Sequence, residues 1–248
     1  MNRVSSLAGF LALDFLRHRL MVFLLLLFPL LIIFMAVQGA PDQPVPIHLD
    51  GDLVVPMPAP EEIQVLSFTM TAVALVGALT GFFTGFQLKS LTMRLEVLGV
   101  KPWQVGLAQA IVLVGVDVFV VAFAGNVSRF WIEPVAPGWH YGALLLGTFV
   151  FTLFGLILAR VADSRALGLN VILAVAVLDT AFLENPVLSR RFTEGWLDIL
   201  PAHRPVQLLY RAGFTGQDLW GVDAAAAVLY SLVLSGILIA VMRIERIP

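Results

Sequence analysis

The chain has 248 residues, of which 59% are hydrophobic and only 13% are charged, whereas soluble globular domains carry about 25% charged residues. A soluble fold cannot bury so much apolar surface, so the composition predicts an integral membrane protein. The formal net charge of −2, without a long basic run, argues against a nucleic-acid partner, and the absence of cysteine excludes disulfides and cysteine-ligated metals.

The segment before the first hydrophobic stretch, residues 5–18, mixes apolar side chains such as Leu7 and Phe10 with polar ones such as Asp14 and Arg17. This mixture predicts an amphipathic helix that lies on the inner face of the membrane. A flexible N-terminal tail is the alternative.

Six stretches reach the roughly 20 mainly apolar residues that a membrane-spanning helix needs. The first contains Pro29, which we expect to kink it. Its apolar run is longer than that of a cleaved signal peptide, so we interpret it as a retained helix. The six predicted spans are residues 20–37, 63–86, 105–123, 141–159, 166–183 and 222–242. No internal repeat or low-complexity linker divides the chain, so residues 1–248 are predicted to form one transmembrane domain.

The basic residues gather on one side of these spans. The positive-inside rule then places both termini in the cytoplasm. The first outer loop, residues 38–62, carries acidic residues and no basic one. The basic residues on the predicted inner side are Arg3, Arg17, Arg19, Lys89, Arg94, Lys101, Arg160, Arg165, Arg243 and Arg246.

The inner segment between spans two and three, residues 87–104, predicts a short cytoplasmic helix ended by Gly99 and Pro102. Its leucines are spaced three and four apart and form one apolar stripe on a helix, which fits a groove on a partner protein. The alternative is that the stripe rests on the membrane or packs against the N-terminal helix. The stripe consists of Leu91, Leu95 and Leu98, and the charged rim of Arg94, Glu96 and Lys101.

The outer loop between spans five and six, residues 184–221, holds two apolar patches separated by Pro201 and Pro205. The patches, residues 196–200 and 206–210, are too short to span a bilayer. Re-entrant or interfacial helices are therefore predicted here.

Small residues recur four apart in span two, at Gly77, Gly81 and Gly85. This doubled G-x-x-x-G pattern lets helices approach closely, so we expect a tight helix contact within one chain or between two.

Polar residues interrupt spans three and five, at Asp117, Asn170 and Asp179. A buried carboxylate costs several kcal/mol unless it is paired, neutralised or hydrated. Two interpretations stay open for each acid: proton coupling or substrate binding, or a position near the outer end of its span where the side chain reaches water or headgroups.

Motifs for catalysis are absent from the sequence. It has no G-x-x-x-x-G-K-[ST] loop to cradle ATP phosphates, no His-Glu-x-x-His and no Gly-x-Ser-x-Gly. We therefore expect no enzymatic activity, no metal and no cofactor in this chain itself.

The order of these elements resembles the type-2 ATP-binding cassette (ABC) transporter permeases, over nearly the whole chain. Those proteins open with an interfacial helix and carry, after span two, a stretch similar to G-T-L-E-x-L-x-x-x-P. Here Leu95, Glu96, Leu98 and Pro102 match it, whereas Met93 and the following arginine replace the Gly-Thr pair. The family's outer Leu-Pro…Pro signature is similar to residues 200–205.

The resemblance implies an exporter subunit in a bacterial plasma membrane, present as a homo- or heterodimer of permeases. Two separately encoded ATPases, which bind ATP and magnesium, would dock on residues 87–104 as the coupling helix. The substrate class would be drugs, lipids or glycans, moved outward. The alternatives are a proton-coupled carrier that uses Asp117 and Asp179, and a membrane scaffold that transports nothing.

Overall fold

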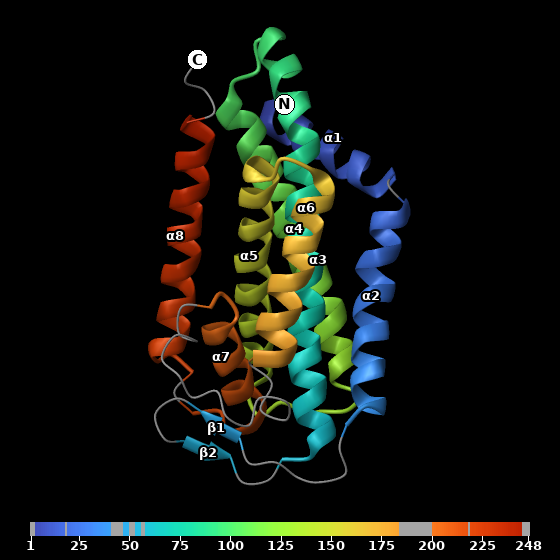
Figure 1. Cartoon of the computed structure of the whole chain (residues 1–248), viewed down its shortest axis with the longest axis vertical. Coiled ribbons are helices and arrows are strands. Elements are labelled where there is room, and N and C mark those ends of the chain that lie inside the picture. The colour runs from blue at the N-terminus through green and yellow to red at the C-terminus, as the bar shows by residue number, and fades with distance from the viewer. Residues whose placement is uncertain are drawn as a thin grey trace.

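The computed structural model describes residues 3–17, 19–40, 47–49, 53–55, 58–183, 200–217 and 219–244. Within these residues the chain forms eight α-helices, one π-helical segment and two short strands, and most of the helices run side by side along the long axis (Figure 1). The elements are α1 (Arg3–Arg17), α2 (Arg19–Gln38), β1 (Ile47–Leu49), β2 (Leu53–Val55), α3 (Pro60–Val97), α4 (Pro102–Ser128), α5 (Pro137–Val161), α6 (Arg165–Ala176), η1 (Val177–Leu183), α7 (His203–Phe214) and α8 (Val222–Ile244).

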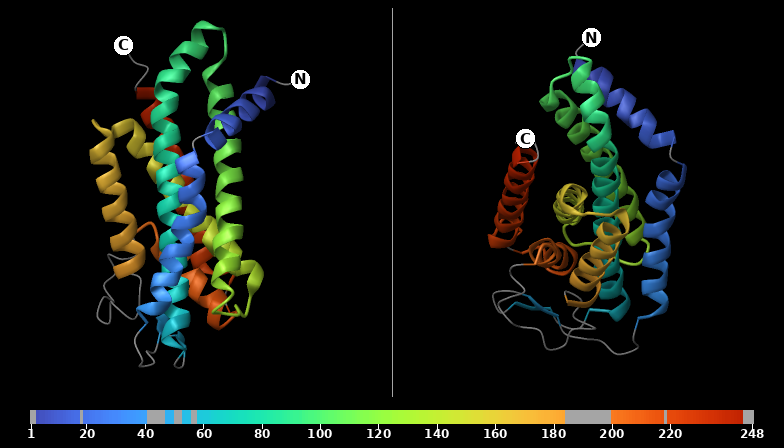
Figure 2. Two further views of the ribbon diagram at one scale, coloured as in Figure 1. Left: turned by 90° about the vertical axis from the view of Figure 1, so that its right-hand side faces the viewer. Right: turned by 45° about the horizontal axis from the view of Figure 1, so that its top comes forward.

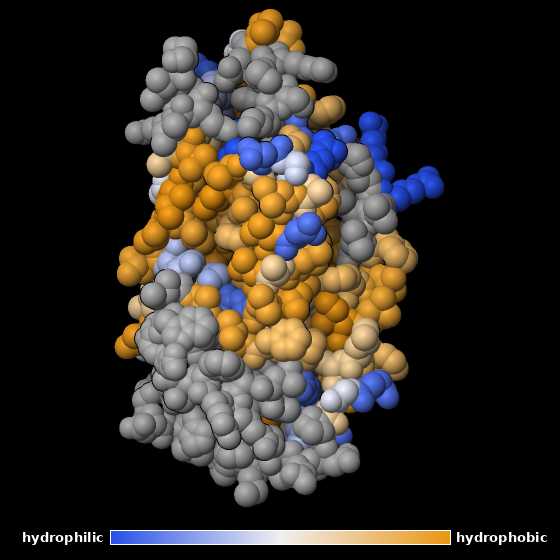
Figure 3. All heavy atoms as spheres, in the orientation of Figure 1, coloured by the Kyte–Doolittle hydropathy of each residue, from blue (hydrophilic) through white to orange (hydrophobic). Residues whose placement is uncertain are grey.

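Five stretches of helix are long and apolar enough to cross a membrane, which confirms five of the six predicted spans by length and composition. They are Pro60–Leu88, Pro102–Ser128, Pro137–Val161, Arg165–Leu183 and Val222–Met242. The predicted first span forms α2, whose described residues include the apolar stretch Leu25–Gln38. Hydrophobic residues cover most of the coloured surface along the middle of the bundle (Figure 3). The chain is therefore a multi-pass membrane protein.

The two ends of the bundle differ. The start of α1, the end of α8 and the turn from α3 to α4 lie at one end, which we name the α1 end, at the top of Figure 1. At the opposite end, named the α7 end, lie α7 and the antiparallel pair β1 and β2. Figure 2 shows α1 lying across the α1 end at an angle to the spans.

Helix α3 is the centre of the bundle. Of an 18-residue apolar stretch of α3, 89% is buried inside the protein, whereas only 11% of the corresponding stretch of α8, at the periphery, is buried. The face of α3 that carries Gly77, Gly81 and Gly85 packs on α5. A Cβ atom on Gly77 would lie 2.7 Å from the carbonyl oxygen of Thr148, and one on Gly85 would lie 2.8 Å from the Cβ of Ala159. The glycines therefore make a close contact inside one chain, as small residues do between membrane helices.

The segment predicted as a separate short helix is instead the end of α3, which runs unbroken to Val97. Residues 87–97 contain no glycine or proline and are rich in good helix formers, so nothing interrupts the helix after the apolar part ends. The break comes where it was expected. Gly99 adopts a φ of +77°, which favours glycine, and Pro102 starts α4.

The predicted patch at residues 206–210 lies in α7, a helix of 12 residues that is too short to span. Val206, Leu208, Leu209 and Tyr210 are all buried, so α7 is packed into the α7 end of the bundle. The patch at residues 196–200 lies outside the described residues except for its last residue.

Candidate functional site

The turn from α3 to α4 carries apolar side chains that no other part of the described chain covers. We name residues 97–103 the α3–α4 tip. Val97 is 87% exposed, Leu98 76% and Trp103 59%, and Lys101 is exposed beside them. A group of large apolar side chains on an exposed turn marks a surface for a protein or a membrane.

The backbone of the tip is held by local hydrogen bonds. The amide of Val100 donates to the carbonyl oxygen of Leu95 over 3.0 Å and closes the end of α3. The amide of Lys101 donates to Gln104 Oε1 over 3.1 Å, and the amide of Gln104 donates back to the carbonyl oxygen of Lys101 over 2.9 Å. The tip is therefore a defined continuation of two helices.

The predicted leucine stripe is divided between two environments. Leu91 and Leu95 pack against a small hydrophobic cluster that joins α1, α3 and α4, whereas Leu98 is exposed. The buried members of that cluster are Val4, Ala8, Leu11, Leu88, Val105 and Ala108. The first two leucines thus attach α1 to the bundle, and only the end of the stripe is open to a partner.

The charged rim of the stripe is only partly described. Arg94 and Glu96 lie in α3, but their side chains are outside the described part of the structure. Lys101 and Pro102 both lie in the tip.

Asp117 is buried at the contact between α4 and α5, with 1% of its surface exposed. Its Oδ1 accepts a hydrogen bond of 3.0 Å from Thr152 Oγ1. Its Oδ2 has no hydrogen-bond partner among the described residues. Asp117 is thus an intramembrane carboxyl group inside the protein, where an ionised form is costly.

Asp179 is also buried, at 2% exposed, and does not reach water or headgroups as one interpretation expected. It lies in η1, and its Oδ2 accepts a hydrogen bond of 2.9 Å from the backbone amide of Ala202, just before α7. Next to it, Thr180 Oγ1 donates to Thr71 Oγ1 over 2.8 Å. Asp179 therefore fixes α7 to the fifth span. Asn170 lies on the exposed surface of α6.

A buried charge cluster at the α7 end was not singled out by the sequence. Asp223, at the start of α8, accepts a hydrogen bond of 2.9 Å from Arg204 Nη1. It also forms an ion pair with Arg211, whose Nε lies 2.9 Å from Asp223 Oδ2. The two arginines are seven residues apart, about two turns of α7, so they point to the same side. The spacing of the two arginines, together with an acidic residue at the start of the next span, was the sequence signal that could have revealed this cluster. The cluster fastens α7 to α8.

The described residues hold no group of three or more His, Cys, Asp or Glu side chains that could bind a metal ion. Neither the models of protein families nor the curated proteins compared with the chain match it.

Proposed function

We propose that this chain is the permease subunit of an ATP-driven ABC exporter, working as a dimer with separate ATPase subunits. The observation that carries the proposal is the α3–α4 tip. It presents Val97, Leu98 and Trp103 on an exposed turn at the end of the most buried helix.

The length of α3 supports this role. Its 38 residues make it about 57 Å long, whereas the hydrocarbon core of a bilayer is about 30 Å thick. The helix therefore extends well beyond the core, and its apolar span Pro60–Leu88 puts the projecting part at the α1 end. A protein that docks on the tip therefore contacts one end of a long helix that runs through the bundle.

The positive-inside rule gives the orientation of α3 across the membrane. It places the α1 end, with both termini, in the cytoplasm, where an ATPase has access to the tip. In this arrangement α2 is the first of six spans, α1 lies on the inner membrane surface and α7 belongs to the outer face.

Movement of the tip has a direct route to the other spans. The glycine face of α3 is in backbone contact with α5, and α5 in turn packs on α7 and α8. Tightly packed helices move together, so a displacement of α3 is passed to the spans around it. The motif resemblance supplies the substrate class, a drug-like, lipid-like or glycan molecule.

The test is purification of the tagged chain from the membranes of its native host, followed by an assay of magnesium-dependent ATP hydrolysis. We expect ATPase activity to purify with the chain and to be lost with the double variant Leu98→Ala/Trp103→Ala. The matched control is Trp220→Ala/Val222→Ala, an exposed apolar pair at the α7 end. Equal loss from both pairs, or no ATPase with the native chain, would refute the proposal.

One observation favours a proton-coupled carrier as a second candidate: the buried Asp117 carboxyl group, whose Oδ2 has no partner among the described residues. In the exporter, Asp117→Asn retains ATP-dependent transport because the amide oxygen still accepts from Thr152. In a carrier, the same change abolishes transport, and collapse of the pH gradient stops transport with ATP present.

A further inference from the structure

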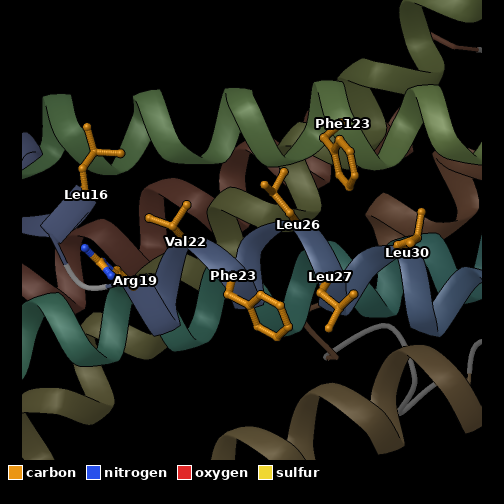
Figure 4. Close-up of a pocket in the computed structure, with 8 residues that line it drawn as sticks. All are labelled: Leu16, Arg19, Val22, Phe23, Leu26, Leu27, Leu30 and Phe123. Carbon is orange, nitrogen blue, oxygen red and sulfur yellow. The ribbon is translucent and has the colours of Figure 1, made fainter.

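A groove of about 530 Å³ lies between α2 and α4, next to the junction of α1 and α2. Its lining is apolar except for a single arginine at one end. Figure 4 shows Arg19 at that end, a row of side chains following along α2, and Phe123 of α4 on the opposite side. The lining includes Val22, Phe23, Leu26, Leu30 and Phe123.

The groove has the length of one lipid leaflet. From Arg19 to Leu30 the chain advances eleven residues along α2, about 16 Å. Half of a hydrocarbon core about 30 Å thick is about 15 Å. Helix α2, which lines the groove, runs along the bundle, and its first turn lies toward the α1 end (Figure 1). Arg19 is the first residue of α2, so it lies at the level of the headgroups of that leaflet.

Arg19 is exposed and forms no ion pair with another described residue. A long arginine side chain at the end of a membrane helix directs its guanidinium toward the headgroups. There it meets phosphate oxygens, which match the planar, two-pronged donor geometry of a guanidinium. A positively charged end followed by an apolar length matches a molecule with an anionic head group and an apolar chain.

We propose that the groove binds one acyl chain of an anionic phospholipid from the leaflet at the α1 end, with the lipid phosphate on Arg19. The chain lies along Val22, Leu26 and Leu30, and the ring of Phe123 closes the side toward α4. The lipid thereby fills the space between α2 and α4. This proposal requires only that the chain is in a membrane, and it holds whether or not an ATPase docks on the tip.

The experiment is native mass spectrometry of the purified, full-length chain in detergent with equal amounts of dipalmitoyl phosphatidylglycerol and dipalmitoyl phosphatidylcholine. We expect one lipid retained per chain, with phosphatidylglycerol preferred about fivefold, the change given by one arginine near an anionic surface. Arg19→Gln should remove the preference, and Leu26→Trp, which fills the groove, should remove the retained lipid.

Two matched controls separate the groove from general surface effects. Arg17→Gln removes the same charge from an exposed position two residues away that does not line the groove, and it should keep the preference. Leu229→Trp adds the same bulk to an exposed position on α8, and it should keep the lipid. The proposal is overturned if Arg17→Gln acts like Arg19→Gln, or if Leu26→Trp retains as much lipid as Leu229→Trp. It is also overturned if Leu26→Trp instead separates two copies of the chain and leaves lipid retention unchanged.

Discussion

Gly81 of α3 lies directly against the backbone of Thr152 in α5, so closely that a methyl group at position 81 would overlap the carbonyl group of Thr152. Thr152 also donates to Asp117 Oδ1 over 3.0 Å. Three helices therefore meet at one residue, and the centre of the bundle depends on the absence of a side chain on α3.

Replacing Gly81 tests this contact. Gly81→Ala should destabilise the protein by about 1–3 kcal/mol, the usual cost of overpacking, because a backbone carbonyl cannot rotate away from the new methyl group. The measurement is thermal unfolding of the purified chain in detergent. Gly115→Ala on α4 is the control, since nothing lies within 4 Å of a Cβ atom there, and it should be neutral or slightly stabilising. A similar loss of stability in both variants would contradict the close contact.

The charge cluster at the α7 end gives a second prediction. Asp223→Asn removes the negative charge between Arg204 and Arg211, and breaking a buried ion pair costs about 3–5 kcal/mol. We expect α7 to separate from α8 more often. The measurement is the maleimide labelling rate of a buried α7 reporter, Ala212→Cys, which should rise in the Asp223→Asn background.

The chain has no native cysteine, so this reporter is the single labelled position. Lys101→Cys, exposed at the other end of the protein, should label at the same rate with and without Asp223→Asn. An unchanged rate at position 212 would mean that the ion pairs do not hold α7 in place.

The orientation of the bundle is tested by the same chemistry in intact cells. Gln217→Cys, exposed at the α7 end, should react with a membrane-impermeant maleimide added outside. Lys101→Cys in the α3–α4 tip should react only after the membrane is permeabilised. Reaction of both positions from outside, or of Lys101→Cys alone, would refute a cytoplasmic α1 end.

The spans were predictable because hydropathy and length alone define a membrane helix. The prediction of 166–183 for the fifth span agrees with the observed Arg165–Leu183, and that of 222–242 with Val222–Met242. The end of α3 was not predictable in the same way. Hydropathy falls after Leu88 although the backbone remains helical to Val97, because a change in composition does not by itself end a helix.

The hydrogen-bond partners of the polar residues could not be predicted from the sequence either. Asp179 meets the Ala202 amide 23 residues later, and Thr152 meets Asp117 35 residues away; such pairs follow from tertiary packing, for which a helix pattern has no signal. The division of the leucine stripe has the same origin. Periodicity places Leu91, Leu95 and Leu98 on one face, but only the position of α1 decides that the first two are covered.

Docking of an ATPase on the α3–α4 tip is tested by crosslinking in native membranes. Leu98→Cys is treated with a thiol-to-amine crosslinker, and the adduct is identified by peptide mass spectrometry. We expect a partner that carries a G-x-x-x-x-G-K-[ST] phosphate-binding loop, and no such partner from Trp220→Cys at the α7 end. A nucleotide-binding partner at Trp220→Cys, or none at Leu98→Cys, would contradict the role of the tip.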